Sequence, residues 1–494
     1  MTEARVERAK IPADVLALCE VLGAAGHRAW VVGGCIRDVL RGEAVSDWDL
    51  ATSATPAEVM RVFPKTIPTG VAHGTVTVLW KRGAYEVTTL RGEGAYSDGR
   101  RPDAVEFVRD IEGDLARRDF TVNAIAYDPL EESLVDPYGG LADLGRRLLR
   151  AVGEPGRRFA EDGLRILRAA RFVASLEFEL EAETERAIPG ALDTFRKVSH
   201  ERVQQEWLKA LKARAPSRAF EVMRRTRVLE VTLPELAECF GCEQNHHHAF
   251  DVWTHTMKTL DDAPVEPSLR LAAVLHDIGK PRTRGRSEKT GEYTFYHHEQ
   301  VGAEMSDRWL RAYRFSNDLR EEVVALVRHH LICYAPEWSD AAVRRFVRRV
   351  EPRRVSPLLR LARADVRAKG KPVEAELKLL DELEARIGQV ASSSAALSTG
   401  DLALDGQALM KGLGIPPSRR IGVLLEALLE EVLERPELNE AAVLLERAKA
   451  LHASLPMDTP KRSERERAAR GTGAGGAGNG EGAGTGGNES GGAR

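Results

Sequence analysis

The spacing of apolar residues changes once along this chain, near residue 150, and that change constrains the fold more than any other feature of the sequence. From about Trp30 to Phe107, short runs such as "AWVV", "GTVTVLW" and "AYEVTTL" are rich in β-branched and aromatic residues and are separated by Gly, Pro and Asp. This pattern predicts short strands with helices between them. From Arg157 to Leu455, the spacing is that of amphipathic helices with a few polar breaks. We therefore expect an α+β protein, with a small mixed α/β head followed by all-α parts.

The same changes in pattern divide the sequence into five predicted parts. They are a head at residues 1–150, a helical neck and body at 151–245, a second helical domain at 246–370, a helical tail region at 371–456 and a Gly-rich segment at 457–494. The Gly-rich segment has almost no apolar side chains and cannot bury enough surface to fold, so we expect a disordered tail.

Composition excludes some classes of function. The 494 residues carry a formal net charge of -3, so the molecule is not basic overall and any nucleic-acid surface must be local. The five cysteines are scattered and odd in number, which indicates reduced thiols and a cytoplasmic protein. The N-terminus lacks a secretion signal and no apolar run approaches membrane-spanning length, so we expect no membrane partner.

Two carboxylates lie in the second predicted strand, "DWDLA". Asp47 and Asp49 are separated by one residue, so on a strand both side chains point to the same face and repel each other unless a divalent cation lies between them. Mg²⁺ prefers a few carboxylate oxygens together with substrate phosphates, and two such ions can bind the attacking and leaving oxygens of an in-line displacement. Glu86, in "AYEVTTL", is a possible third carboxylate from a neighbouring strand. Taken alone, the Asp-x-Asp spacing favours a solvated strand end.

A glycine turn immediately before this pair changes that interpretation. Gly33 and Gly34 end the preceding strand where a helix is predicted to begin, and Arg37 lies one turn inside that helix. Glycines permit close backbone approach, a helix N-terminus presents free N–H groups to an anion, and a guanidinium binds phosphate in a bidentate way. Together with Asp47 and Asp49, these residues predict a triphosphate site beside a metal site.

A second polar set interrupts the otherwise apolar segment "DLARRDFTVNAIAYD". Arg118 and Asp119 are ordinary surface residues in most sequences, but Asn123 lies between Val122 and Ala124, which is unusual for a packed helix. We therefore treat Arg118, Asp119 and Asn123 as possible members of the same site.

The segment "RRFAEDGLRILRAARF" places four charged residues at steps of three, so that on one helix they form a slanting stripe: Asp162, Arg165, Arg168 and Arg171. One interpretation is an ordinary helix with internal ion pairs. Another uses base chemistry, because cytosine and adenine each offer an amino donor beside a ring-nitrogen acceptor. A carboxylate accepts from the amino group while an arginine donates to the ring nitrogen, whereas uracil and guanine mismatch both. Asp162 with Arg165 is thus a hypothetical reader of C and A.

These motifs, in this order, resemble those of bacterial class II tRNA nucleotidyltransferases, the CCA-adding family, which also includes A-adding, CC-adding and poly(A)-polymerase members. The resemblance covers about Trp30 to Phe172 and includes "VVGGCIRDVLRGEAVSDWDLAT", "EVTTLR", "DPYGGLADL" and "EDGLRILRAARF". It implies a polymerase-β-like head and helical domains that hold the 3′ end of tRNA, not DNA. Within the family, "TGVAHGTVTV" looks like CCA-adding members, and residues 91–108 resemble a loop that helps the switch from C to A.

The resemblance also implies roles for individual residues. Asp47 and Asp49 would bind Mg²⁺ and act in catalysis, while Gly34, Arg37 and Arg118 would contact the phosphates and sugar of ATP or CTP. Asp162 and Arg165 would select the base, supported by Arg168 and Arg171. The reaction would be attack of the RNA 3′-hydroxyl on the α-phosphate, with release of pyrophosphate. Which member of the family this is, and its oligomeric state, stay open.

Histidines and aspartates recur through the second helical domain, at His255, His276, Asp277, His298, His329 and Asp365. A His-Asp doublet at the end of an apolar helix, with distant His and Asp partners, is a typical metal-ligand arrangement. It resembles the HD phosphohydrolase family, which implies a Mg, Mn, Ni or Fe ion and a bound water that hydrolyses phosphoesters of RNA ends or nucleotides. A pure hydrolase whose head only binds nucleotide is the alternative of a different class. The C-x-x-C pair Cys239 and Cys242 is a weak zinc signal, because no second pair follows.

Overall fold

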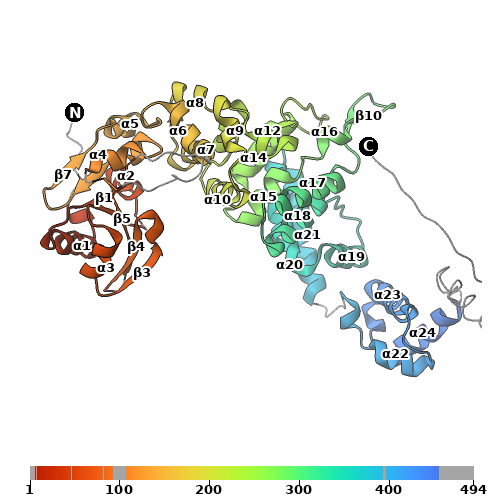
Figure 1. Cartoon of the computed structure of the whole chain (residues 1–494). Helices are drawn as coiled ribbons and strands as arrows, with labels where there is room; N and C mark the ends of the chain where they lie inside the picture. The colour runs from red at the N-terminus through yellow and green to blue at the C-terminus, as the bar shows by residue number, and fades with distance from the viewer. Residues whose placement is uncertain are drawn as a thin grey trace, which may run out of the picture. The chain divides into compact units, whose positions relative to one another are not determined.

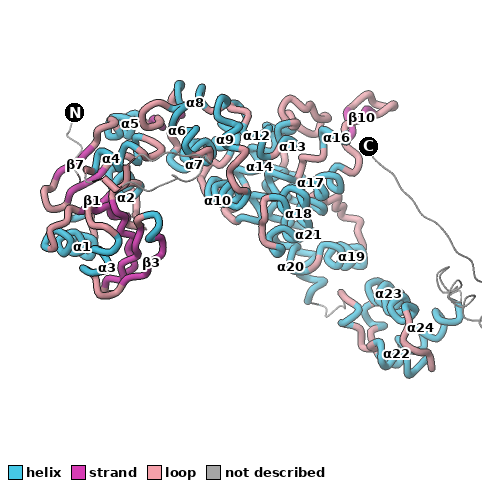
Figure 2. Tube along the Cα trace, in the orientation of Figure 1, coloured by secondary structure: helices cyan, strands magenta, loops and turns pink. Residues whose placement is uncertain are grey.

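The computed structural model describes residues 6, 8–45, 47–81, 83–92, 107–108, 110–392 and 397–454. The Gly-rich segment at 457–494 and nearly all of the predicted loop at 91–108 lie outside the described residues. The chain divides into two compact units, one of residues 1–338 with 349–386 and one of residues 339–348 with the described residues from 387 onward. The five-part division of the sequence stays a prediction. The α+β class is confirmed, since strands gather in the N-terminal part and helices make up most of the rest (Figure 2).

The head contains a seven-stranded sheet with the order β3-β4-β5-β2-β1-β6-β7 (Figure 1). Its strands are β1 (Ala29–Val32), β2 (Asp49–Thr52), β3 (Thr66–Gly70), β4 (Thr75–Trp80), β5 (Gly83–Thr89), β6 (Ala126–Asp128) and β7 (Ser133–Val135). The β2–β5 pair is parallel and the other pairs are antiparallel. In the parallel pair Asp49 lies opposite Glu86.

Both faces of β1 are covered, which explains why this strand is apolar throughout. Val31 packs into a core with α1 (Ala13–Ala24), α2 (Gly34–Arg41) and α3 (Pro56–Val62), while Trp30 and Val32 pack on the other face near α4 (Ile111–Ala116). This alternation follows from the strand geometry, in which successive side chains point to opposite faces. A capping box between Thr55 and Glu58 begins α3.

Helices carry the rest of the first unit. They are α5 (Gly140–Arg146), α6 (Pro155–Glu161), α7 (Leu164–Leu176), α8 (Ala182–Ala187), α9 (Leu192–Phe195), α10 (His200–Ala210), α11 (Ser217–Arg225), α12 (Val228–Thr232), α13 (Pro234–Ala237), α14 (Val252–Asp262), α15 (Pro267–Leu275), α16 (Lys280–Thr283), α17 (His298–Ala312), α18 (Asn317–His329) and α20 (Pro352–Arg367). Two short sheets join β8 (Leu148–Leu149) to β9 (Glu179–Leu180) and β10 (Gly285–Arg286) to β11 (Tyr293–Thr294).

The remaining helices are α19 (Asp340–Val350), α21 (Glu374–Ser392), α22 (Gly406–Leu413), α23 (Arg419–Glu434) and α24 (Ala441–Ser454). In the second unit, α22, α23 and α24 share an apolar core that includes Leu409, Leu428 and Leu444. Among the described helices, none has both the length and the apolar character that crossing a membrane requires.

Candidate nucleotide and metal sites

The acidic edge of the parallel strand pair forms the centre of the first site. Asp49 begins β2 and faces Glu86 across the pair, whereas Asp47 lies two residues before the strand starts. The strand argument therefore applies to Asp49 only, yet all three side chains line one cavity. Burial raises the pKa of Asp49; the nearby Arg118 opposes this, and the negative charges of Glu86 and Asp47 add to it. An acidic cluster of this kind favours a bound divalent cation.

The glycine turn at the start of α2 lies against the side chain of Arg118. Gly33 is the N-cap and has φ 80, a left-handed value that glycine adopts without strain. A Cβ atom on Gly33 would lie 2.6 Å from Arg118 Nη1, so a side chain there would also displace this guanidinium. The helix N-terminus and Arg118 thus converge on one side of the cavity, beside Asp49.

Arg118 is itself held by a buried acid. Asp114 pairs with Arg118 at 3.2 Å and with Arg117 at 2.5 Å. Burial disfavours the charged form of Asp114, but the two guanidinium groups outweigh it and hold the pKa of this carboxyl below its usual range. The sequence analysis missed Asp114, although its spacing of three and four residues before two arginines is the signal for such pairs on a helix.

A buried hydrogen-bond chain explains Asn123. Arg37 Nη1 donates to Asn123 Oδ1 at 2.6 Å, Asn123 Nδ2 donates to Asp119 Oδ1 at 3.0 Å, and Arg168 Nη2 donates to Asp119 Oδ2 at 2.5 Å. The amide is useful here because it accepts on one side and donates on the other. These hydrogen bonds therefore fix Arg37 of α2 and Arg168 of α7 relative to each other.

The substitution Asp119→Asn tests whether this buried hydrogen-bond chain contributes to the stability of the protein. Burial disfavours the charged Asp119, but Arg168 and Asn123 outweigh it and hold its pKa well below the usual range. Because the pKa of Asp119 is lower in the folded than in the unfolded protein, its ionised carboxylate stabilises the fold at pH values above the unfolded pKa of about 3.9. This stabilisation is lost progressively as the pH falls below that value. We expect Asp119→Asn to lower the free energy of unfolding by about 2–3 kcal/mol at pH 7, less than for a fully buried pair because the Arg168 side chain is 32% exposed.

Urea unfolding at pH 7 and at pH 3.5 measures this effect, in the transition that includes the head. The difference between wild type and Asp119→Asn should shrink at the lower pH, because Asp119 loses part of its ionic contribution there. Asp193→Asn is the matched control, since its carboxylate pairs with Arg196 but is 93% exposed. Equal losses for the two variants would contradict a role of the buried chain.

The predicted stripe is confirmed on one helix for its three arginines, which lie on α7, but not for Asp162. α6 ends at Glu161 and α7 begins at Leu164, so Asp162 lies between the two helices in an extended conformation. The break occurs at Gly163, where a Cβ atom would lie 2.6 Å from Phe195 Cα. The backbone of another segment thus occupies the space that a side chain at this position needs, which local spacing could not reveal.

The charged residues around the break have partners that the sequence analysis did not identify. Arg165 Nη1 donates to Glu161 at 2.7 Å and its Nη2 donates to the carbonyl of Arg117 at 2.8 Å. Arg171 pairs at 2.6 Å with the buried Glu206 of α10. Asp162 pairs at 2.7 Å with Arg202 of α10.

One cavity of about 730 Å³ brings these side chains together. It is lined by every residue that the sequence suggested for this site: Gly33, Gly34, Arg37, Asp47, Asp49, Glu86, Arg118, Asp119, Asn123, Asp162, Arg165, Arg168 and Arg171. Its volume is in the range of a small-molecule site, with acidic groups at one part and arginines around them. This combination suits a metal-bound polyphosphate with a base.

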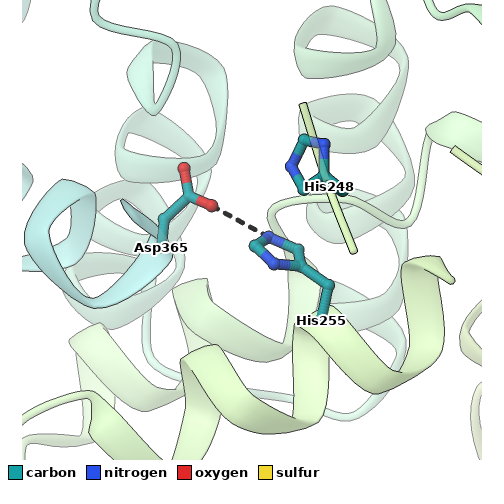
Figure 3. Close-up of side chains that lie close together, drawn as sticks. All are labelled: His248, His255 and Asp365. Atoms are coloured by element: carbon teal, nitrogen blue, oxygen red, sulfur yellow. Dashed lines mark ion pairs between the residues drawn. The ribbon is translucent and has the colours of Figure 1, made fainter. Parts of the chain in front are cut away.

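A second cluster lies among α14, α15, α17, α18 and α20. His255 Nε2 is 2.8 Å from Asp365 Oδ1, and Figure 3 shows the two side chains facing each other with His248 beside them. His276 Nε2 is 3.3 Å from His255 Nε2, and the adjacent Asp277 is fully buried. Three overlapping groups have atoms close enough to share a metal ion: His248, His255 and Asp365; His255, His276 and Asp277; and Asp277, His298 and His330.

The structure places His330, and not His329, in this cluster. His330 Nε2 is 3.8 Å from Asp277 Oδ1 and 3.3 Å from His298 Nε2. Neighbouring residues on a helix point about 100° apart, so only one of the two histidines can face the centre. His329 is half-buried and belongs to none of the three groups. His248 and His330 are the residues that the sequence analysis missed.

Hydrogen bonds fix the protonation of three of these histidines. The Nδ1 atoms of His276, His298 and His330 lie 2.7–2.8 Å from the carbonyls of Ala273, Phe295 and Val327. A carbonyl only accepts, so each Nδ1 carries a proton, and in the neutral imidazole the lone pair of Nε2 is then available to a metal ion. Burial, followed by the charges of nearby histidines, lowers the pKa of His330 to about 3, which keeps it neutral. Lone pairs that face each other at 3.3 Å in a buried site fit a cation between them.

A positively charged side chain lies at the edge of the cluster. Lys280 Nζ is 2.7 Å from Asp277 Oδ2 and the same Nζ donates to Gln244 Oε1.

The pair Cys239 and Cys242 gives no support to a zinc site. Both thiols are buried, burial raises their pKa values, and neither belongs to a possible ligand group among the described residues.

Three family models match the chain in sequence order. They are described as "Poly A polymerase head domain" at residues 29–150, "Probable RNA and SrmB- binding site of polymerase A" at 177–240 and "HD domain" at 246–383. The first covers the sheet with the acidic edge and the third covers the histidine cluster.

Curated relatives include CCA-adding enzymes of two genera. The enzyme of Lactobacillus delbrueckii subsp. bulgaricus is 35% identical over 446 residues, which cover 90% of this chain and 99% of that protein. The enzyme of Listeria monocytogenes is 42% identical over 248 residues, which cover 50% of this chain and 62% of that protein. The alignment with the Listeria enzyme therefore spans less than two thirds of it.

Solved structures show a similar architecture. A crystal structure of the Bacillus stearothermophilus CCA-adding enzyme in complex with CTP matches with a TM-score of 0.68 and 28% identity, over 90% of this chain and 98% of that chain. The Thermotoga maritima CCA-adding enzyme complexed with tRNA matches with a TM-score of 0.51 and 20% identity, over 89% and 96% of the two chains. The second likeness concerns the fold alone.

Proposed function

Since the chain belongs to the CCA-adding enzyme family, we propose that it adds CMP and AMP from CTP and ATP to the 3′ end of tRNA and completes the terminal CCA. The observation that carries this proposal is the single cavity in which Asp49 and Glu86, the Gly33–Gly34 turn and the Asp162–Arg165 pair meet. We assign the reaction to the head at 1–150, and base selection and RNA binding to the neck and body at 151–245.

The residues of the cavity suggest how the reaction proceeds. Asp47 and Asp49, with Glu86 beside them, would hold Mg²⁺, which neutralises phosphate charge and activates the RNA 3′-hydroxyl when bound. The N–H groups at Gly34 and the guanidinium of Arg118 would orient the triphosphate so that the α-phosphate faces the 3′-hydroxyl.

The base would be selected by hydrogen bonds to Asp162 and Arg165, which line the same cavity. Asp162 would accept from the amino group of C or A, and Arg165 would donate to the ring nitrogen. Two of the five Arg165 N–H groups are needed for the contacts to Glu161 and the Arg117 carbonyl, and a third for the Arg158 carbonyl, so two remain for a base.

Defined tRNA substrates test this function directly. A tRNA that lacks the whole CCA should gain two nucleotides with CTP alone and three with CTP and ATP, and a complete tRNA should not be extended. An A-adding enzyme would extend only the tRNA that ends in CC, a CC-adding enzyme would stop after two nucleotides, and a poly(A) polymerase would extend the complete tRNA with ATP. Product lengths on a sequencing gel distinguish these outcomes, and no incorporation at all would leave the hydrolase alternative.

We also propose that the domain at 246–370 is a metal-dependent phosphohydrolase. The Nε2 atoms of His276 and His298, turned towards Asp277 by their backbone hydrogen bonds, are the observation that favours it. His255, His276, Asp277 and Asp365 would hold one ion, for which the two imidazoles suit Ni or Fe and the two carboxylates suit Mn or Mg. Asp277 with His298 and His330 would hold a second. The substrate class is a phosphomonoester or cyclic phosphate of a nucleotide or RNA end.

A further inference from the structure

We propose that His248 is a further ligand of the metal ion that His255 and Asp365 help to hold, and that this ligand is supplied by the loop at residues 243–249 and not by a helix. The assignment rests on the proposed metal-dependent hydrolysis and adds an imidazole to the ligands proposed for that ion.

The imidazole of His248 faces the cluster. Its ring centroid lies 4.8 Å from that of His255, with the two rings nearly perpendicular. A ligand atom from each of His248, His255 and Asp365 lies within 4.8 Å of the other two, and Figure 3 shows both His248 and Asp365 next to the His255 ring. Two atoms that bind one ion at about 2.1 Å are at most about 4.2 Å apart, so only a small closure of the three side chains is needed.

A buried nitrogen of His248 lacks a partner. Its Nδ1 is screened from solvent and makes no hydrogen bond with any residue that the structure describes. Leaving a buried polar atom unpaired is costly, so such an atom in a native fold calls for a partner of another kind. A metal ion bound at this nitrogen would remove the cost, and a neutral imidazole has the lone pair that the ion requires.

The loop that carries His248 is held at both ends. At its start, Lys280 Nζ donates to Gln244 Oε1 at 2.7 Å. At its end, the backbone N–H of Ala249 donates to the carbonyl of Lys369 at 2.9 Å. These contacts present the imidazole to the cluster before an ion binds, which lowers the entropic cost of adding it as a ligand.

His255 can serve only one ion. Its Nε2 is the atom that lies 2.8 Å from Asp365, 3.3 Å from His276 and 3.7 Å from Asp277. A ring nitrogen has one lone pair, so the group with His248 and the group with His276 share their ion. The three overlapping groups therefore describe two ions and not three.

The shared ion would be open to solvent on the side of the loop. The side chain of Asp365 is 17% exposed and His248 is half-buried, whereas the side chains of His255 and Asp277 are completely or almost completely buried. A substrate phosphate would therefore approach this ion past His248 and Asp365.

Removing His248 should change which metals bind more than it changes the fold. Imidazole ligands suit Ni²⁺, whereas Mn²⁺ is suited by carboxylates, which this change leaves in place. Loss of an outer partner of a metal ligand already costs about 10- to 100-fold in affinity. We therefore expect His248→Ala to weaken Ni²⁺ binding at least about tenfold and Mn²⁺ binding less than about threefold.

Competition with a chelating dye measures both affinities on metal-free protein. All proteins carry Asp49→Ala, so that the acidic edge of the head does not contribute. The visible spectrum of the Co²⁺-loaded protein reports the change of ligand without any assay of activity. His247→Ala is the matched control, because this neighbouring histidine is exposed, stacks on His246 and belongs to none of the three groups.

His248→Gln provides a second variant that keeps a polar side chain, and it should show the same loss of Ni²⁺ affinity. Thermal unfolding of the metal-free proteins reports whether the fold is intact. Unchanged Ni²⁺ affinity and an unchanged Co²⁺ spectrum in both His248 variants would overturn the assignment, as would equal losses of Ni²⁺ and Mn²⁺.

Elemental analysis gives the number of ions for each chain. Two bound ions are expected with His248 intact, and three would contradict the shared ion. Failure of the proposed hydrolysis looks different, because the protein with an intact His248 would then bind neither Ni²⁺ nor Mn²⁺ and would hydrolyse no phosphoester.

Discussion

Asp49→Ala abolishes nucleotide addition: we expect kcat to fall at least about 1000-fold while phosphoester hydrolysis by the same sample is unchanged. The carboxylate begins β2 opposite Glu86, and burial, together with the negative charges of Glu86 and Asp47, raises its pKa. Removing it deletes a ligand of the proposed Mg²⁺ site, and electrostatic stabilisation of this kind contributes several kcal/mol to catalysis.

Incorporation of radiolabelled CMP into tRNA that lacks CCA is the measurement. Glu86→Gln should give a smaller loss than Asp49→Ala, because it removes one charge of the cluster and keeps the shape. Glu43→Ala is the control, since this glutamate lies just beyond α2 with a side chain that is 61% exposed. An Asp49→Ala protein that keeps a tenth of the wild-type rate would mean that the acidic edge is not the reaction centre.

Removal of the buried acid of the second cluster has the complementary effect. Asp277→Ala should lower divalent-metal content and reduce phosphoester hydrolysis at least about 100-fold, because Asp277 is common to two of the three possible ligand groups. Nucleotide addition should change by less than about threefold, since no residue of this cluster lines the cavity of Asp49. Elemental analysis of the purified protein and hydrolysis of a nucleoside 2′,3′-cyclic phosphate are the two measurements.

Two adjacent histidines offer a matched pair for this prediction. His330→Ala should lower metal content and hydrolysis, while His329→Ala should leave both near wild type, because only His330 lies near His298 and Asp277. Treatment of the wild-type protein with a chelator should also abolish phosphoester hydrolysis, and added Mn²⁺ should restore it. Equal losses in the two histidine variants would contradict the assignment of the cluster.

Much of the first site could be predicted from the sequence, because its main features are local. Gly33 and Gly34 share one turn, and Asp47 lies only two residues before Asp49 at the start of β2, so proximity in the sequence alone places these residues near each other. Their common cavity with the stripe of α7 followed from the resemblance, not from any local pattern.

The parts that the sequence could not predict depend on contacts between distant segments. Arg202 reaches Asp162 across 40 positions of the chain, and Gly163 breaks the helix because the backbone at Phe195 approaches it. The choice of His330 over His329 depends on the phase of α18 at its last turn, which an amphipathic pattern fixes only to within a residue. Each of these facts requires tertiary packing.

The parallel pairing of β2 with β5 has a consequence for how this head can vary. Parallel neighbours need a crossover, and here α3 and the β3–β4 hairpin provide it between Asp49 and Glu86. The register of the two strands is set by four residue pairs of their own, from Asp49–Glu86 to Thr52–Thr89. The distance between the two carboxylates therefore does not depend on the length of the segment that connects β2 to β5. Insertions or deletions in α3, β3 and β4 can accumulate without moving Asp49 relative to Glu86.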